Sequence, residues 1–343
     1  MHAHNTLWLA CLSSCSNVPI WSSRLYNKSF KPRTRGSQWC RNNNFPQRRT
    51  TMEENQVVLK RQKYSTWFKL DDVRPLAFFV ILACLLGWMP YIVSALGAAD
   101  IAAVLGDNGS LANWPFGPLV AAAIVSAFLG RAGLKNWWRR LTTFRAAPGW
   151  YILAFVAPVV IVSAAVLANS ALGAPLPTAS QLSKWTDLPG LFVVYLIGVG
   201  IGEEAAWTAF AAPLVLRRHK FINAWLILAA IRVFWHLPLM ITGQLPWTMG
   251  IGGNIAFQFL MLWLFRRSSG VWLLAAVWHA MLNATSGGFF FQMVQGPDQA
   301  RLGLLFTAAY VLVAAAVYLF DHSNLDMADE FSRAGAAGGT VVD

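Results

Sequence analysis

The sequence predicts an all-α fold, a polytopic membrane bundle of about eight transmembrane helices. Of its 343 residues, 56% are hydrophobic and only 12% are charged, whereas charged residues make up about 25% of an ordinary soluble domain. Several apolar runs approach the roughly 20 residues that an α-helix needs to cross a bilayer. These observations indicate a multi-pass integral membrane protein.

Eight apolar stretches are expected to form the spans. They are residues 75–96, 115–130, 150–172, 188–216, 221–241, 247–265, 270–285 and 302–320. Basic residues precede the first span and follow the second, fourth and sixth, while the other loops carry few of them. Because cytoplasmic loops are enriched in Lys and Arg, both termini are predicted to be cytoplasmic.

Two segments flank the membrane domain, which is expected to occupy residues 75–320. Residues 1–70 are basic and rich in serine, and no acidic residue occurs before Glu53. This composition is typical of a disordered tail or a transit-like segment, and Met52 offers an alternative start. Residues 321–343 are expected to be a short cytoplasmic tail.

The formal net charge of +12 does not indicate a nucleic-acid partner. Nucleic-acid binding calls for basic residues on one folded face, whereas here they lie in the N-terminal segment and the short loops, where membrane orientation explains them. The expected partner is instead the lipid bilayer.

The fourth span carries two adjacent acids, Glu203 and Glu204, with more than ten uncharged residues on either side. A charged side chain at the centre of a membrane helix costs roughly 2.5–3.5 kcal/mol on insertion scales. Residues kept at that cost are functional by default, so the pair is the first candidate for an active site.

Three other spans carry pairs of polar residues four positions apart, which places each pair on one helical face. The pairs are Arg232 and His236, Asn254 and Gln258, and His279 and Asn283. Asn254 and Gln258 are interpreted as interhelical hydrogen-bonding residues. The histidines fit either hydrogen-bonded packing or chemistry.

Depth in the membrane favours chemistry. At 1.5 Å per residue from the nearest basic anchor, Glu203 lies about 21 Å deep, His236 about 24 Å and His279 about 18 Å. Two neutral imidazoles and a carboxylate could hold zinc (Zn²⁺) with a fourth position open to water. Alternatively, a desolvated glutamate could itself act as general base, with the histidines assisting. Asn283 could donate hydrogen bonds to a developing oxyanion.

Three segments, EEAAW in the fourth span, FWHLP in the fifth and HAMLN in the seventh, resemble the motifs of the CPBP/Abi intramembrane proteases. This family includes the CAAX prenyl-protein endopeptidases, and its pattern is EExxxR, FxxxH and HxxxN. The resemblance implies that 75–320 is a protease domain acting on a protein or peptide substrate, which could be membrane-anchored or prenylated.

The resemblance also implies a role for each matching residue. Glu203 would activate the hydrolytic water with Glu204 as its partner, His236 and His279 would be the essential histidines, and Asn283 would stabilise the oxyanion or ligate a metal. Family members are described as metalloproteases, which implies zinc on Glu203, His236 and His279, and a metal-free glutamate mechanism has also been argued.

Two positions depart from the family pattern. Thr208 stands where EExxxR has its arginine, and Arg232 stands where FxxxH has its phenylalanine. The paired change predicts that the cation has moved from the fourth span to the fifth, where Arg232 reaches Glu204 across facing helices.

The predicted function is therefore intramembrane hydrolysis of a peptide bond by a glutamate-activated, zinc-assisted water. The alternative is a catalytically inactive interaction or immunity protein of the same fold. A proton-coupled transporter is disfavoured, because the sequence shows no paired broken helices in repeated halves.

Overall fold

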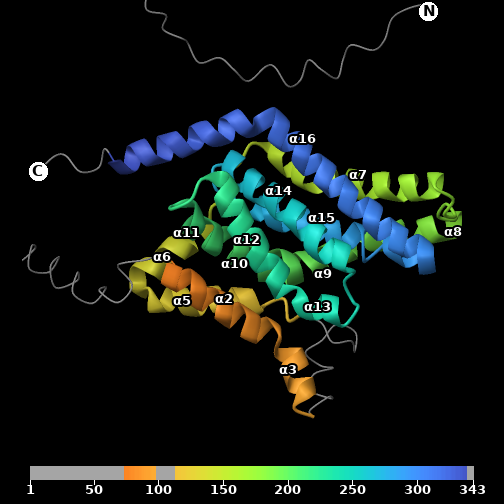
Figure 1. The fold of residues 1–343 in the computed structure, drawn as a ribbon, viewed down its shortest axis with the longest axis horizontal. Helices are drawn as coiled ribbons and strands as arrows, with labels where there is room; N and C mark the ends of the chain where they lie inside the picture. The colour runs from red at the N-terminus through yellow and green to blue at the C-terminus, as the bar shows by residue number, and fades with distance from the viewer. Residues whose placement is uncertain (1–72, 98–112, 338–343) are drawn as a thin grey trace, which may run out of the picture. The chain divides into compact units, whose positions relative to one another are not determined.

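The computed structural model describes residues 73–97 and 113–337, and within these ranges the chain forms helices and no strand. The all-α prediction is confirmed. The predicted N-terminal segment, 1–70, and Met52 lie outside the described residues. Figure 1 shows the helices gathered around α10, α12, α14 and α15.

Every predicted span coincides with helix. In chain order the elements are α2 (Val73–Gly87), α3 (Met89–Ala95), α5 (Gly117–Phe128), α6 (Gly130–Leu141), α7 (Pro148–Ala171), α8 (Ala179–Leu182), η1 (Ser183–Asp187), α9 (Leu188–Tyr195), η2 (Leu196–Ile201), α10 (Gly202–Ala206), η3 (Trp207–Ala211), α11 (Ala212–Leu216), α12 (Phe221–Trp235), α13 (Leu237–Ile241), η4 (Met249–Gly253), α14 (Asn254–Arg267), α15 (Leu273–Thr285), η5 (Phe290–Met293) and α16 (Gly296–Ala337).

The count of eight spans is not confirmed. Among the described residues, three helices are long and apolar enough to cross a membrane: Pro148–Ala171, Ala179–Leu216 and Gly296–His322. A fourth results if α2 and α3, bent by 54° at Trp88, are counted as one span. Two of the remaining predicted spans are shorter apolar helices, Gly117–Phe128 and Phe221–Trp235. The second of them is followed by a separate short helix, α13, with a proline in its first turn.

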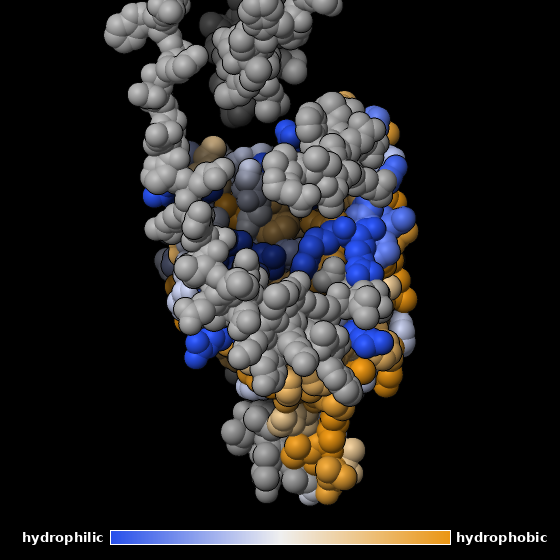
Figure 2. Space-filling model, turned by 90° about the vertical axis from the view of Figure 1, so that its left-hand side faces the viewer, coloured by the Kyte–Doolittle hydropathy of each residue, from blue (hydrophilic) through white to orange (hydrophobic). Residues whose placement is uncertain are grey.

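The basic loop after the second predicted span is itself a helix, α6. Its sequence, GRAGLKNWWRRL, ends in Arg139 and Arg140, and only Trp137 is buried. The Trp137 indole donates to the carbonyl of Ala205 at 3.0 Å, and Arg140 donates to that of Ala209 at 3.4 Å. This polar helix is thereby fastened to the span that carries the two glutamates. Figure 2 shows hydrophilic side chains gathered around the height of α6 and α11, and apolar ones below, down to α3.

The C-terminal boundary predicted at residue 320 does not end a helix. α16 continues to Ala337, and Asp321, assigned to the tail, accepts a hydrogen bond from the Trp263 indole at 2.8 Å and pairs with Arg267 at 3.2 Å. Leu325 is also buried. The beginning of the predicted tail therefore packs on α14, because an acidic side chain meets cationic and indole donors there.

Glycines let the glutamate-bearing span pack closely on its neighbours. A Cβ at Gly202 would lie 2.7 Å from the Pro115 carbonyl oxygen, and one at Gly200 would lie 2.9 Å from the Ala276 carbonyl oxygen. Both distances are shorter than van der Waals contact, so α10 could not keep this position beside Pro115 and α15 with larger residues.

Gly202→Ala is therefore expected to lower the free energy of unfolding by about 1–3 kcal/mol, the usual cost of overpacking. The matched control is Gly198→Ala in the same span, where a Cβ would meet only Pro115 Cγ, at 4.0 Å. Thermal unfolding of the detergent-solubilised protein measures both variants. Equal shifts in melting temperature would contradict the close-packing argument.

Candidate active site

The two glutamates lie on α10, a short α-helical segment between two π-helical ones, η2 and η3. All five residues of α10 are buried, with Glu203 3% and Glu204 0% exposed. π-helical turns shift the helical register and occur often at functional sites. Here they change which faces of the span the two carboxylates occupy.

Glu204 is the fully paired member of the two. Its Oε1 accepts from Arg232 Nη2 at 2.8 Å and from His279 Nδ1 at 3.0 Å, and its Oε2 accepts from the Thr208 hydroxyl at 2.5 Å. The predicted contact between Arg232 and Glu204 is thus present. Thr208, at the position of the family arginine, contributes a neutral hydrogen bond to the same carboxylate.

Arg232 joins three spans through its guanidinium. Besides Glu204, its Nε donates to Gln258 Oε1 at 2.8 Å, and its Nη1 lies 3.6 Å from Glu203 Oε2. The guanidinium carbon also lies 5.0 Å from the centre of the Phe257 ring. Gln258 therefore is the interhelical hydrogen-bonding residue that its sequence position predicted. Asn254, by contrast, donates to Gly250 in its own helical stretch.

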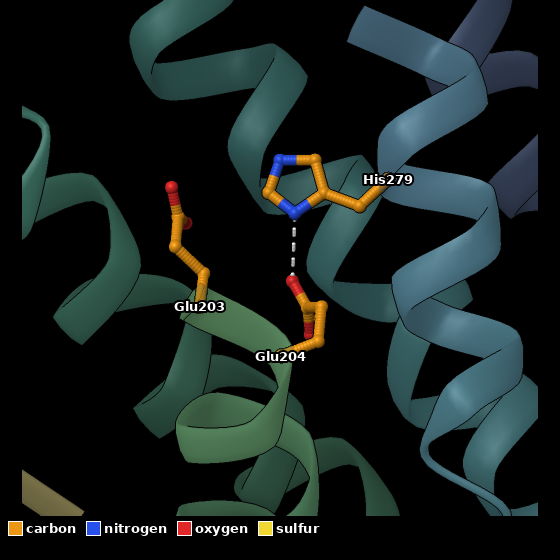
Figure 3. A group of neighbouring side chains, drawn as sticks. All are labelled: Glu203, Glu204 and His279. Carbon is orange, nitrogen blue, oxygen red and sulfur yellow. Dashed lines mark hydrogen bonds and ion pairs between the residues drawn. The ribbon is translucent and has the colours of Figure 1, made fainter. Parts of the chain in front are cut away.

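Glu203 has a different environment from its neighbour. Its Oε2 is buried and has no hydrogen-bond partner among the described residues. Figure 3 shows the Glu203 carboxylate apart from Glu204, to the left of the His279 ring, while the bond to Glu204 lies below the ring. A buried carboxylate oxygen without a partner is costly, and it is free to receive a proton.

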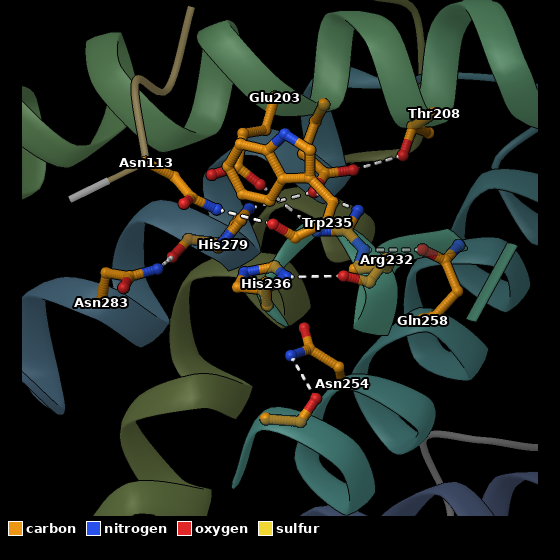
Figure 4. A network of polar contacts seen from close by, with 12 residues as sticks. Asn113, Glu203, Thr208, Arg232, Trp235, His236, Asn254, Gln258, His279 and Asn283 are labelled. Carbon is orange, nitrogen blue, oxygen red and sulfur yellow. Dashed lines mark hydrogen bonds and ion pairs between the residues drawn. The ribbon is translucent and has the colours of Figure 1, made fainter. Parts of the chain in front are cut away.

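The two histidines are held in the same way. His236, which ends α12, has Nδ1 2.8 Å from the Arg232 carbonyl, and His279 on α15 has Nδ1 3.0 Å from Glu204. A carbonyl and an ionised carboxylate only accept, so each Nδ1 carries the hydrogen. In its neutral form, each ring therefore keeps the lone pair on Nε2, the arrangement in which a second group fixes the tautomer. Figure 4 shows this network.

Asn283 lies one turn after His279 on α15. Its amide nitrogen donates to the His279 carbonyl at 3.0 Å. An amide carries two hydrogens, so one remains for another acceptor.

One cavity of about 590 Å³ brings the predicted residues together. Glu203, His236, His279 and Asn283 line it, together with Asn113, which no motif contains. These four residues, predicted from three different spans, thus line one shared cavity. Glu204 and Arg232 do not line it. They lie behind the cavity wall, in contact with residues that do.

The residues predicted to hold zinc come together only in part. Among the described residues, donor atoms of Glu203, Glu204 and His279 lie within 4.8 Å of one another and could hold a metal ion, but His236 does not belong to this group. The predicted set of Glu203, His236 and His279 is therefore not assembled. The Nδ1 of His236 is bonded to the Arg232 carbonyl, which leaves Nε2 available as a ligand atom but does not bring it into that group of donors.

Sequence reasoning missed Asn113 because a polar residue just before an apolar run reads as a loop residue. The Trp-Pro-Phe-Gly-Pro stretch after it, with two prolines next to a span start, was the signal that the chain turns tightly there.

Comparison with known proteins agrees with the geometry. Residues 185–285 match the model of a family described as type II CAAX prenyl endopeptidase Rce1-like. No curated protein matches the chain. The matched segment contains Glu203, Glu204, His236, His279 and Asn283. Residues 185–285 are thus similar to the Rce1-like CAAX prenyl endopeptidases, which agrees with the resemblance of the three motifs.

Proposed function

We propose that the protein is an intramembrane endopeptidase of the CAAX-processing type, which hydrolyses a peptide bond with a water activated by Glu203. The observation that carries the proposal is that the two adjacent glutamates have different surroundings. Glu204 has hydrogen-bond partners on both oxygens, whereas the buried Oε2 of Glu203 has no hydrogen-bond partner among the described residues and only a longer ion pair with Arg232, at 3.6 Å. Glu203 also lines the cavity with two imidazoles.

The reaction begins with a water held against Glu203. The carboxylate accepts one proton from the water, and the oxygen attacks the carbonyl carbon of the scissile bond. Glu203 takes one hydrogen of the water, so the second is left for the Nε2 atom of one histidine, His236 or His279, which accepts rather than donates in the neutral ring.

The tetrahedral intermediate needs a hydrogen-bond donor for its oxyanion. Asn283 has one amide hydrogen that is not used within α15, and this hydrogen is the donor in our proposal. When the carbon–nitrogen bond breaks, the proton on Glu203 passes to the leaving amine, which returns the carboxylate to its initial state.

The substrate class follows from the surroundings of the cavity. The site lies among apolar helices, and the matched family is named for CAAX prenyl endopeptidases. A peptide anchored to the bilayer by a prenyl group would reach such a site from the membrane. Accordingly, the proposed substrates are membrane-anchored or prenylated peptides.

Zinc-assisted hydrolysis is the second candidate mechanism, favoured by the group of Glu203, Glu204 and His279 donors. A bound zinc would polarise the scissile carbonyl and acidify a water. Against it, the Arg232 guanidinium already lies beside both carboxylates, and its positive charge opposes a second cation.

We therefore expect turnover of a prenylated CAAX peptide to survive removal of divalent metals by a chelator. The measurement is cleavage by the purified protein before and after chelation, with elemental analysis for zinc. Loss of turnover that one equivalent of zinc restores would establish the zinc mechanism instead. A protein with zinc bound but no cleavage of any prenylated or other membrane peptide would support the inactive alternative.

A further inference from the structure

Asn113 is a polar residue of the cavity wall that lies outside all three motifs. It is 8% exposed and lines the cavity with Glu203 and His236. It directly precedes Trp114, whose backbone N–H donates to the Gly87 carbonyl at 2.8 Å. The chain at this point is therefore held against the end of α2.

The orientation of the Asn113 amide is fixed by its partner. Its Nδ2 lies 2.8 Å from the backbone carbonyl of Trp235, the residue before His236. A carbonyl oxygen only accepts, so the nitrogen must face it and the oxygen must face away. Figure 4 shows the amide between the Trp235 carbonyl and the side of the site that carries Asn283.

The Asn113 side-chain oxygen has no hydrogen-bond donor. Oδ1 is buried and has no hydrogen-bond partner within residues 73–97 and 113–337. Buried acceptors are nearly always paired, so an unpaired one in a cavity wall calls for a donor that arrives with a ligand. In the proposed function the water is held by Glu203 and an imidazole Nε2, and Asn113 Oδ1 has no part in that step.

We propose that Asn113 binds the substrate backbone, its Oδ1 accepting a hydrogen bond from one peptide N–H of the bound chain. This inference rests on the proposed function and adds a substrate contact to it. A peptide backbone offers an N–H at every residue except proline. An oxyanion would be repelled by Oδ1, so Asn113 serves substrate binding and Asn283 the oxyanion.

Trp88 provides a matched control. Its indole donates to the same Trp235 carbonyl at 2.9 Å, but Trp88 does not line the cavity. Trp88→Phe therefore removes one support of that carbonyl, as Asn113→Ala does, without touching the cavity wall. A purely structural role of Asn113 predicts the same effect for both variants.

The test uses a farnesylated peptide ending in a CAAX sequence and a set of its variants, each with one backbone nitrogen methylated. Asn113→Ala is expected to raise KM about five- to fiftyfold with kcat little changed, since one hydrogen bond to the ligand is lost. Trp88→Phe is expected to change KM less than about twofold, because it makes no ligand contact. One methylated peptide should show the same loss with the wild-type protein and no additional loss with Asn113→Ala.

Two results would overturn the inference while leaving the proposed function intact. The first is an equal rise in KM for Trp88→Phe and Asn113→Ala. The second is an additional loss in Asn113→Ala for every methylated peptide, which would mean that no single N–H is its partner.

Peptide binding to Glu203→Gln separates failure of the inference from failure of the proposed function. If the wild-type protein cleaves nothing but Glu203→Gln binds the peptide, and Asn113→Ala in that background weakens binding at least about fivefold, the inference stands and hydrolysis does not. If the peptide does not bind at all, both are overturned.

Discussion

Glu203→Gln is expected to lower kcat for cleavage of a prenylated CAAX peptide by about 10²–10⁴-fold, the range that a general base contributes. The substitution keeps the size of the side chain but removes the group that takes the proton from water. Because Glu203 Oε2 has no hydrogen-bond partner among the described residues, the fold should tolerate the change. The measurement is single-turnover cleavage in detergent micelles, with thermal unfolding to confirm the fold.

Glu204→Gln is the informative comparison, since it makes the same chemical change one residue along. Glu204 holds Arg232, His279 and Thr208, so its substitution should lower the melting temperature more than Glu203→Gln does. Turnover in Glu203→Gln above about a tenth of the wild-type rate would contradict the assignment of the general base.

Arg232→Phe is expected to destabilise the protein by about 3–5 kcal/mol, because it leaves a buried carboxylate without its cation. Arg232 is 1% exposed and Glu204 is 0% exposed, so water cannot replace the lost partner. His279 would also lose its fixed orientation, since Glu204 holds its Nδ1, and activity should fall with stability. Unfolding temperature and kcat are measured together.

The rescue experiment is Thr208→Arg combined with Arg232→Phe, which restores the family pattern in both motifs. A cation four residues after Glu204 on the same span could pair with the same carboxylate. We expect the double variant to regain at least half of the lost melting temperature, and Thr208→Arg alone to be destabilising, because two cations would then crowd one carboxylate. If Arg232→Phe alone kept full stability and activity, the exchange of cations would be refuted.

The positions of the helices could be predicted from the sequence, but the number of spans could not. Apolar runs such as 150–172 and 188–216 coincide with α7 and with the stretch from α9 to α11. Hydropathy averages over composition, however, and does not register a 54° bend at Trp88 or the break after Trp235 at His236. Pro90 and Pro238 follow these two breaks in the first turn of the next helix, but a proline does not fix the angle at which the chain continues.

The parts of the site that depend on spacing within one helix could be predicted from the sequence. His279 and Asn283 are four residues apart, and so are Arg232 and His236, so helical geometry alone places each pair on one face. The exchange of Thr208 and Arg232 was predicted only through the resemblance to the CPBP/Abi motifs, and the contact between Arg232 and Glu204 agrees with it.

The sequence by itself determined an all-α membrane protein with an acidic pair inside an apolar helix and two histidines on other apolar helices. Only the tertiary structure decided which acid faces the cavity, because adjacent residues on a helix differ by about 100° in direction and the π-helical turns beside α10 shift that register. The tertiary structure also places His236 outside the group of Glu203, Glu204 and His279 donors, and it places Asn113 in the wall of the cavity. Contacts between segments that are far apart in the sequence decide these three features, and the spacing of residues along the chain does not predict such contacts.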